Sequence, residues 1–106
     1  MTHDEMSETA EKASELLRVL SNQKRLLILC KLGEGEHSVY QLQEATGLGQ
    51  STVSQQLAKL RGERLVKARR EAQSVYYSLS SNEVEALIDT LYGLYCPPKC
   101  GDSATG

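Results

Sequence analysis

The spacing of the apolar residues constrains this chain most, because it changes along the sequence from a helical to a strand pattern. Apolar residues recur every three or four positions in four successive segments up to residue 60, which predicts four amphipathic helices. Two short runs with strand-favouring residues, LVKARR and SVYYSL, follow on either side of a polar EAQ and predict a β-hairpin. The helical spacing then returns until Pro97 and Pro98. The predicted order is four helices, a hairpin and a last helix.

Capping and breaking residues predict where these elements begin and end. The first helix is expected from Thr9, after a flexible acidic tail over residues 1–8. Ser80, with Glu83 three positions later, resembles a capping box for the last helix. Other caps and helix-ending glycines are expected at Asn22, Gly33, Ser38 and Gly47. We therefore predict one domain over 9–96 and a second flexible tail over 97–106.

The length of 106 residues leaves room for one domain, and the composition excludes a membrane protein. The longest uninterrupted apolar run is Leu26 to Cys30, far below the roughly 18 to 20 residues that a membrane span needs. The start of the chain is acidic, unlike the basic start of a signal peptide. The sequence therefore predicts a soluble cytoplasmic protein that does not bind membranes. A homodimer would help so short a chain to cover its apolar helices.

The charge is unevenly distributed, although the net charge is only −2. Residues 59–71 hold six basic and two acidic side chains, a local charge of +4. Residues 1–15 hold five acidic side chains and one lysine, a local charge of −4. Because salt screens charges beyond about 10 Å, the local charge decides what each segment can bind. The basic segment can therefore bind a polyanion, or it is simply a solvated charged face.

Two short helices joined by a tight turn and followed by a basic hairpin are the parts of a winged helix-turn-helix. The second of these helices reads GQSTVSQQLAKLRG. If Val53 points inward, Ser51 and Gln55 lie nearly opposite at 100° per residue, with Thr52 and Ser54 on the flanks. The outward face then consists of small hydroxyls and amides, which hydrogen-bond base edges and phosphates. This combination predicts binding to double-stranded DNA.

The stretches LRVLSNQKRLLILCKL, QLQEATGLGQSTVSQQLAKLR and LVKARREAQSVYYSLS resemble the ArsR/SmtB family of bacterial winged-helix repressors over residues 10–95. The resemblance implies a repressor that binds operator DNA. It implies base or backbone contacts from Gln50, Ser51, Ser54 and Gln55, and wing contacts from Arg70 and Gln73. The predicted DNA-binding set also includes Thr52, Gln56, Lys59 and Arg69.

The same resemblance implies a homodimer built on the first and last helices, with an interface formed by Leu16, Leu20, Leu87, Ile88 and Leu91. Two positions depart from the family pattern. Gly49 stands where the family often has Ser, and Arg64 stands where it usually has Gly, just past the recognition helix. Gly49 removes a side-chain cap, and Arg64 is a poor residue for a left-handed helix end.

The usual metal ligands of the family are missing from this sequence. The helix before the recognition helix, VYQLQEATG, contains no Cys or His, and the last helix offers only Glu83, Glu85 and Asp89. His3 and His37 fall in the predicted tail and in a loop. We therefore predict no metal site and no cofactor.

The cysteines are the remaining candidates for sensing an inducer. ILC in the second helix and YCPPK after the last helix resemble the persulfide-sensing BigR/SqrR type of the family. That resemblance implies a disulfide or polysulfide bridge between Cys30 and Cys96, formed on exposure to persulfide or polysulfide, which releases the DNA. The residues alone leave Cys30 open as a small buried hydrophobe.

Three other functions remain open. Cys30, Cys96 and Cys100 could form a three-thiolate site for arsenite or another soft ion in a repressor. The chain could also be an architectural DNA binder without an inducer. A thiol enzyme is disfavoured, since no base partner for a nucleophilic cysteine is identifiable. We therefore predict no catalytic residues.

Overall fold

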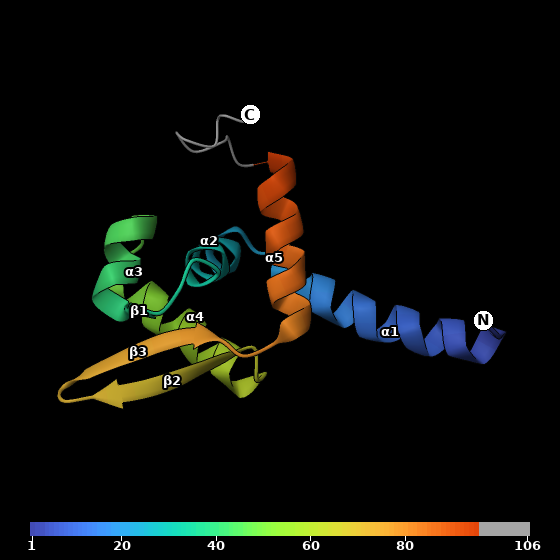
Figure 1. The fold of residues 1–106 in the computed structure, drawn as a ribbon, viewed down its shortest axis with the longest axis horizontal. Helices are drawn as coiled ribbons and strands as arrows, with labels where there is room; N and C mark the ends of the chain where they lie inside the picture. Colours follow the sequence, from blue (N-terminus) through green and yellow to red (C-terminus); the bar gives the residue numbers. More distant parts are fainter. Residues whose placement is uncertain (96–106) are drawn as a thin grey trace.

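Five helices and three strands make up residues 1–95, the part of the chain that this computed structural model describes (Figure 1). In chain order they are α1 (His3–Leu20), α2 (Gln23–Leu32), β1 (His37–Ser38), α3 (Val39–Thr46), α4 (Gln50–Gly62), β2 (Val66–Glu71), β3 (Ser74–Leu79) and α5 (Asn82–Tyr95). This order confirms the predicted helices and hairpin, and it adds the short strand β1, which the apolar pattern did not indicate. Cys96 and the tail predicted over 97–106 lie outside the described residues.

Helix α1 begins at His3, whereas the sequence predicted a tail over residues 1–8 and a helix from Thr9. The Thr2 hydroxyl accepts a hydrogen bond from the backbone N–H of Glu5 (3.1 Å), and the Glu5 carboxylate accepts one from the N–H of Thr2 (2.9 Å). This capping box satisfies the first N–H groups of the helix with polar side chains alone. Apolar spacing therefore could not reveal the start of α1.

The other caps follow the prediction at all but one helix. Asn22 caps α2 and Ser38 caps α3, and Gly47 ends α3 with a left-handed φ of 77°. The predicted cap at Ser80 is wrong by one residue, because the Ser81 hydroxyl accepts the hydrogen bond from the Val84 N–H (3.2 Å). The Ser80 hydroxyl instead donates to the carbonyl of Arg64 (3.0 Å) and so ties the start of α5 to the segment after α4.

The strands form one antiparallel sheet in the order β1-β3-β2. Strands β2 and β3 pair from Val66 opposite Leu79 to Glu71 opposite Ser74, so the hairpin turns at residues 72–73 and projects from the helices as a wing (Figure 1). Strand β1 pairs with β3 through Ser38 opposite Tyr76. Because Ser38 also caps α3, this pairing joins the start of α3 to the wing.

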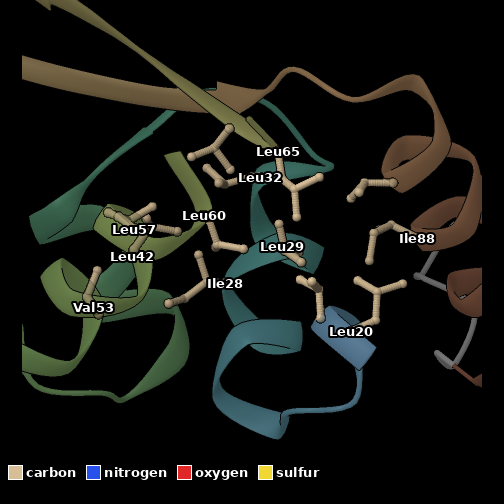
Figure 2. Close-up of a cluster of buried hydrophobic side chains, with 13 residues drawn as sticks. Leu20, Ile28, Leu29, Leu32, Leu42, Val53, Leu57, Leu60, Leu65 and Ile88 are labelled. Atoms are coloured by element: carbon tan, nitrogen blue, oxygen red, sulfur yellow. The ribbon is translucent and has the colours of Figure 1, made fainter. Parts of the chain in front are cut away.

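The core consists of aliphatic side chains from every helix and from the start of β2 (Figure 2). The three inward residues predicted for α4, Val53, Leu57 and Leu60, are all buried in it. Leu20 and Ile88 are also buried in this core, so the single chain already covers two residues that were predicted at a dimer interface. Among the described residues, none of the helices has the length and apolar character to cross a membrane.

Helix α5 packs closely on the end of α2, because Gly33 has no side chain there. A Cβ atom at Gly33 would lie 3.1 Å from Cγ2 of Ile88, which is tighter than ordinary van der Waals contact. All side chains in the buried class of the described chain are apolar, so the core between α1, α2 and α5 is held by the fit of aliphatic side chains.

Arg64, at a position where the family resemblance implies Gly, adopts a left-handed backbone with φ 63°. This conformation costs an L-residue about 1 kcal/mol or more. We therefore expect Arg64→Gly to raise the free energy of unfolding by about 1 kcal/mol, which corresponds to an increase in Tm of about 4 °C, measured by thermal circular dichroism.

The matched control is Arg61→Gly, the same change inside α4, where the backbone is helical. Glycine within a helix should lower the stability by about 1 kcal/mol. A fall in Tm for Arg64→Gly as large as that for Arg61→Gly would contradict a strained backbone at Arg64.

Candidate nucleic-acid interface

Helices α3 and α4 form a helix-turn-helix whose turn is fixed by local hydrogen bonds. The Thr46 hydroxyl donates to the carbonyl of Leu42 (2.6 Å) and accepts from the N–H of Leu48 (3.2 Å). The buried stripe of α4 then faces α2 and α3 (Figure 2). The opposite face of α4 is consequently turned to the solvent. Gly49, at the start of α4, provides no side-chain cap, as the sequence predicted.

The exposed face of α4 carries most of the predicted DNA-binding residues. Ser51, Ser54, Gln55 and Lys59 are exposed, as is Gln50 at the start of the helix, whereas Thr52 is half-buried. Within residues 1–95, the side chains of Ser51, Ser54 and Gln55 make no hydrogen bond. Their hydroxyls and amide are therefore available to an external ligand, as direct reading of base edges requires.

Gln56 differs from the other predicted residues of α4, because it serves a contact within the chain. Its side-chain oxygen accepts a hydrogen bond from Nε of Arg25 on α2 (3.1 Å). Nη1 of Arg25 also donates to the carbonyl of Val19 (3.2 Å). Arg25 thus joins α1, α2 and α4, and Gln56 is half-buried at this junction.

The wing places its basic residues in two different environments. Arg70 and Gln73 are exposed, and neither side chain has a hydrogen bond or ion pair within the described residues. Arg69 instead forms two hydrogen bonds to the Glu36 carboxylate (3.0 and 2.9 Å) and one to Glu71 (2.7 Å). Its guanidinium also lies over the Tyr76 ring, 5.2 Å from the centroid.

These contacts tie the charge of Arg69 to two carboxylates of the same chain. The hydrogen bonds from Arg69 lower the pKa of Glu36, and the two carboxylates raise the pKa of Arg69. Sequence reasoning missed Glu36, because it stands 33 positions from Arg69 and only the pairing of β1 with β3 brings its loop to the wing. Of the predicted basic residues, Arg70 is therefore freer than Arg69 to meet a phosphate.

Cys30 is half-buried on α2, and α5 contacts the same helix. The Tyr92 hydroxyl of α5 donates a hydrogen bond to the carboxylate of Glu34, and Nζ of Lys31 lies 2.8 Å from the other oxygen of that carboxylate. The C-terminal half of α5 is thus tied to the residues that follow α2. Cys96 and Cys100 lie outside the described residues, and so does the predicted bridge between Cys30 and Cys96.

The described residues contain no group of three or more His, Cys, Asp and Glu side chains that could hold a metal ion. His37 lies beside β3, with Nδ1 2.7 Å from the carbonyl oxygen of Gly35, and His3 lies exposed in the first turn of α1.

Comparison with known proteins identifies the family. Residues 22–68 match the model of the arsR family of bacterial regulatory proteins. Over 96 residues the chain is 48% identical to the transcriptional activator HlyU of Vibrio cholerae, covering 91% of this chain and 89% of HlyU. The chain belongs to the arsR family. A structure of reduced HlyU from V. cholerae superimposes with a TM-score of 0.82, covering 88% of this chain and 98% of the other.

Two further relatives are informative. The biofilm growth-associated repressor of Xylella fastidiosa is 38% identical over 91% of this chain and 84% of the relative. The structure of that organism's transcriptional repressor BigR superimposes with a TM-score of 0.82 at 38% identity and covers 92% of this chain and 99% of BigR. A homodimeric winged helix-turn-helix domain from Mycobacterium bovis matches at 30% identity with a TM-score of 0.69, over 88% and 86% of the two chains.

These findings confirm the winged helix-turn-helix and the resemblance to the ArsR family. The relatives are regulators of transcription and not enzymes, so this chain is a transcriptional regulator. The thiol enzyme considered from the sequence is thereby excluded.

The ion pair of Arg69 generates a prediction about DNA affinity. Replacing Glu36 by Gln removes one carboxylate and weakens the hold on the guanidinium, which becomes available to a phosphate. In a titration with a DNA duplex over a range of salt concentrations, Glu36→Gln should bind more tightly and steepen the slope of log K against log salt by about 0.9, the value for one more phosphate contact.

Glu44→Gln is the matched control, because it removes one exposed carboxylate of α3 that makes no ion pair in the described chain. Its slope should stay close to that of the parent protein. Equal slopes for Glu36→Gln and the parent would show that Glu36 does not restrain Arg69.

Proposed function

We propose that this regulator is a homodimeric repressor that binds operator DNA when its thiols are reduced and releases the DNA when Cys30 and Cys96 are bridged. The observation that supports DNA binding most directly is the exposed row of Ser51, Ser54 and Gln55 on α4, together with the exposed and unpaired Arg70 of the wing. Repression is proposed because a relative that matches 91% of this chain at 38% identity is a repressor, although another relative is an activator.

In this proposal α4 enters the major groove and the wing reaches the adjacent minor groove. Ser51, Ser54 and Gln55 read base edges, since amides and hydroxyls both donate and accept hydrogen bonds. Arg70 and Gln73 contact the sugar–phosphate backbone, which fixes the register without reading sequence. The surface also includes Gln50 and Lys59, toward the two ends of the exposed face, and Thr52 on one flank.

This division of roles predicts different losses for two variants. Gln55→Ala should weaken the free energy of binding to a duplex selected from a random pool by about 1–3 kcal/mol. It should also relax the base preference at one position of that duplex. Arg70→Ala should weaken binding to all sequences and reduce the salt slope by about 0.9. Binding curves in salt series for both variants test this, and unchanged affinity in both would reject α4 and the wing as the interface.

The unpartnered parts of α1 and α5 support a homodimer. Residues 1–15 are all exposed, and α1 also leaves Leu17 exposed. The end of α5 exposes Leu94 and Tyr95, and Leu91 is half-buried one turn earlier. Leu16 and Leu87 are likewise half-buried, so the proposed interface consists of these residues rather than of Leu20 and Ile88. A twofold dimer would present two α4 helices to successive major-groove faces about 34–36 Å apart.

The position of Cys30 supports a thiol switch. It lies on α2, which contacts both α4 and α5, so that a covalent bond at Cys30 acts on a helix that touches the DNA-reading helix. Cys96 directly follows Tyr95, the last residue of α5. The bridge would therefore connect α2, which touches the DNA-reading helix α4, to the end of the helix proposed to form the dimer.

The chemistry needs only a polysulfide as oxidant. A cysteine thiolate attacks a terminal sulfur of the polysulfide, and a shorter polysulfide leaves, so that the cysteine becomes a persulfide. The second thiolate attacks the inner sulfur of this persulfide and expels hydrosulfide. The two cysteines have then lost two electrons, and the polysulfide has been reduced. When both cysteines carry an added sulfur, the bridge keeps an additional sulfur atom.

This mechanism predicts that two of the three cysteines are necessary. Cys30→Ser and Cys96→Ser should bind the selected duplex equally well before and after polysulfide treatment. Cys100→Ser, the matched control, should release it like the parent protein. A coupling free energy of about 1–3 kcal/mol between formation of the bridge and binding of DNA corresponds to a loss of DNA affinity of roughly 5- to 150-fold.

Mass spectrometry of the intact protein, followed by peptide mapping, identifies the bridge in the same samples. The expected product joins the peptides that contain Cys30 and Cys96. A Cys100→Ser protein that no longer responds to polysulfide, or a parent protein that releases DNA with arsenite alone, would reject the dithiol switch in favour of a three-thiolate site.

A further inference from the structure

A shallow groove lies between the start of α3, the start of α4 and the wing. It has a volume of about 380 Å³ and is lined by Tyr40 and Gln43 of α3, Gln50 of α4, and Ser74 and Val75 of β3. Figure 1 shows that α3, α4 and the hairpin meet on this side of the molecule, away from α1. The groove therefore separates the two elements that the proposed function assigns to DNA.

The geometry of a DNA duplex requires something to occupy this groove. Major and minor grooves alternate along a duplex, and one sugar–phosphate strand separates each major groove from the adjacent minor groove. If α4 lies in the major groove and the wing in the next minor groove, that strand must cross the surface between them. The surface between the first residue of α4 and the start of β3 is the groove lined by Tyr40.

We propose that this groove holds the sugar–phosphate strand between the two DNA grooves, and that Tyr40 is a DNA-contacting residue of the regulator. The inference rests on the proposed function and adds to it a surface of α3 that the predicted DNA-binding set did not include.

The side chains of the groove suit a phosphate strand. Tyr40 is 68% exposed, and its hydroxyl makes no hydrogen bond within the described residues. The amides of Gln43 and Gln50 and the hydroxyl of Ser74 can also donate hydrogen bonds to phosphate oxygens. The lining includes no carboxylate that would repel a polyanion.

A second hollow, between α1, the end of α4 and the start of α5, provides a contrast. Its volume is similar, about 400 Å³, but Glu15, Glu63 and Glu83 contribute to its lining. These carboxylates repel phosphate even though Lys12 and Arg18 lie in the same hollow. Of these two hollows, the groove beside the wing is the one whose chemistry and position both fit DNA.

Because the groove is neutral, its contribution differs from that of Arg70. Hydrogen bonds from uncharged donors add affinity but do not neutralise a phosphate, so they release no counterion. Tyr40→Ala should therefore lower the affinity for the selected duplex about five- to tenfold and leave the salt slope unchanged. Tyr40→Phe, which keeps the ring, should show the part of this loss that belongs to the hydroxyl.

A pair of charge changes tests the position of the strand. Gln43→Glu puts a carboxylate into the groove and should weaken binding by about tenfold or more at low salt. Gln23→Glu makes the same change on an exposed residue at the start of α2, outside the lining of the groove. Gln23→Glu should weaken binding by no more than about threefold, since its charge lies outside the groove and is screened by salt.

The outcomes separate this inference from the function on which it rests. A parent protein that binds no duplex would overturn the proposed function and the inference together. A parent protein that binds DNA, with Tyr40→Ala equal to it and Gln43→Glu equal to Gln23→Glu, would overturn the inference alone. Unchanged thermal unfolding of each variant shows that the affinities report binding and not folding.

Discussion

Burial of the apolar stripe of α4 against α2 and α3 is the constraint on which the rest of the structure depends. Val53, Leu57 and Leu60 are almost completely buried, and burying each such side chain contributes about 1.5–3 kcal/mol. The stripe fixes the rotation of α4 about its axis. A rotation by one residue, 100°, would turn a different row of side chains toward the core. The row of hydroxyls and amides can face outward only because the leucines face inward.

The sequence predicted the elements well where local chemistry determines them. Asn22, Ser38 and Gly47 act within a few residues of their own position, and each ends or starts a helix as expected. The start of α1 was missed because Thr2 and Glu5 form a polar cap that leaves no apolar signal. The sequence pattern also could not decide whether Ser80 or Ser81 is the N-cap of α5, since both serines stand directly before the first turn of that helix.

The parts of the candidate site that could not be predicted depend on contacts between distant residues. Periodicity shows which face of a helix is apolar but not which neighbour covers it, so Leu20 and Ile88 were assigned to a partner although their own chain covers them. In the same way, the local count of basic residues included Arg69, whose charge is matched by Glu36 from a remote loop. Gln56 faces Arg25 for a similar reason.

The acidic half of α1 and the basic wing lie at opposite ends of the longest axis of the molecule (Figure 1). Separated charges of this kind give the chain a large electric dipole, which the net charge of −2 conceals. The field of a polyanion exerts a torque on this dipole, which turns the wing of each chain forward and its N-terminus away. Approach in this orientation increases the fraction of encounters that are productive, and the gain in association rate declines as salt shortens the range of the field.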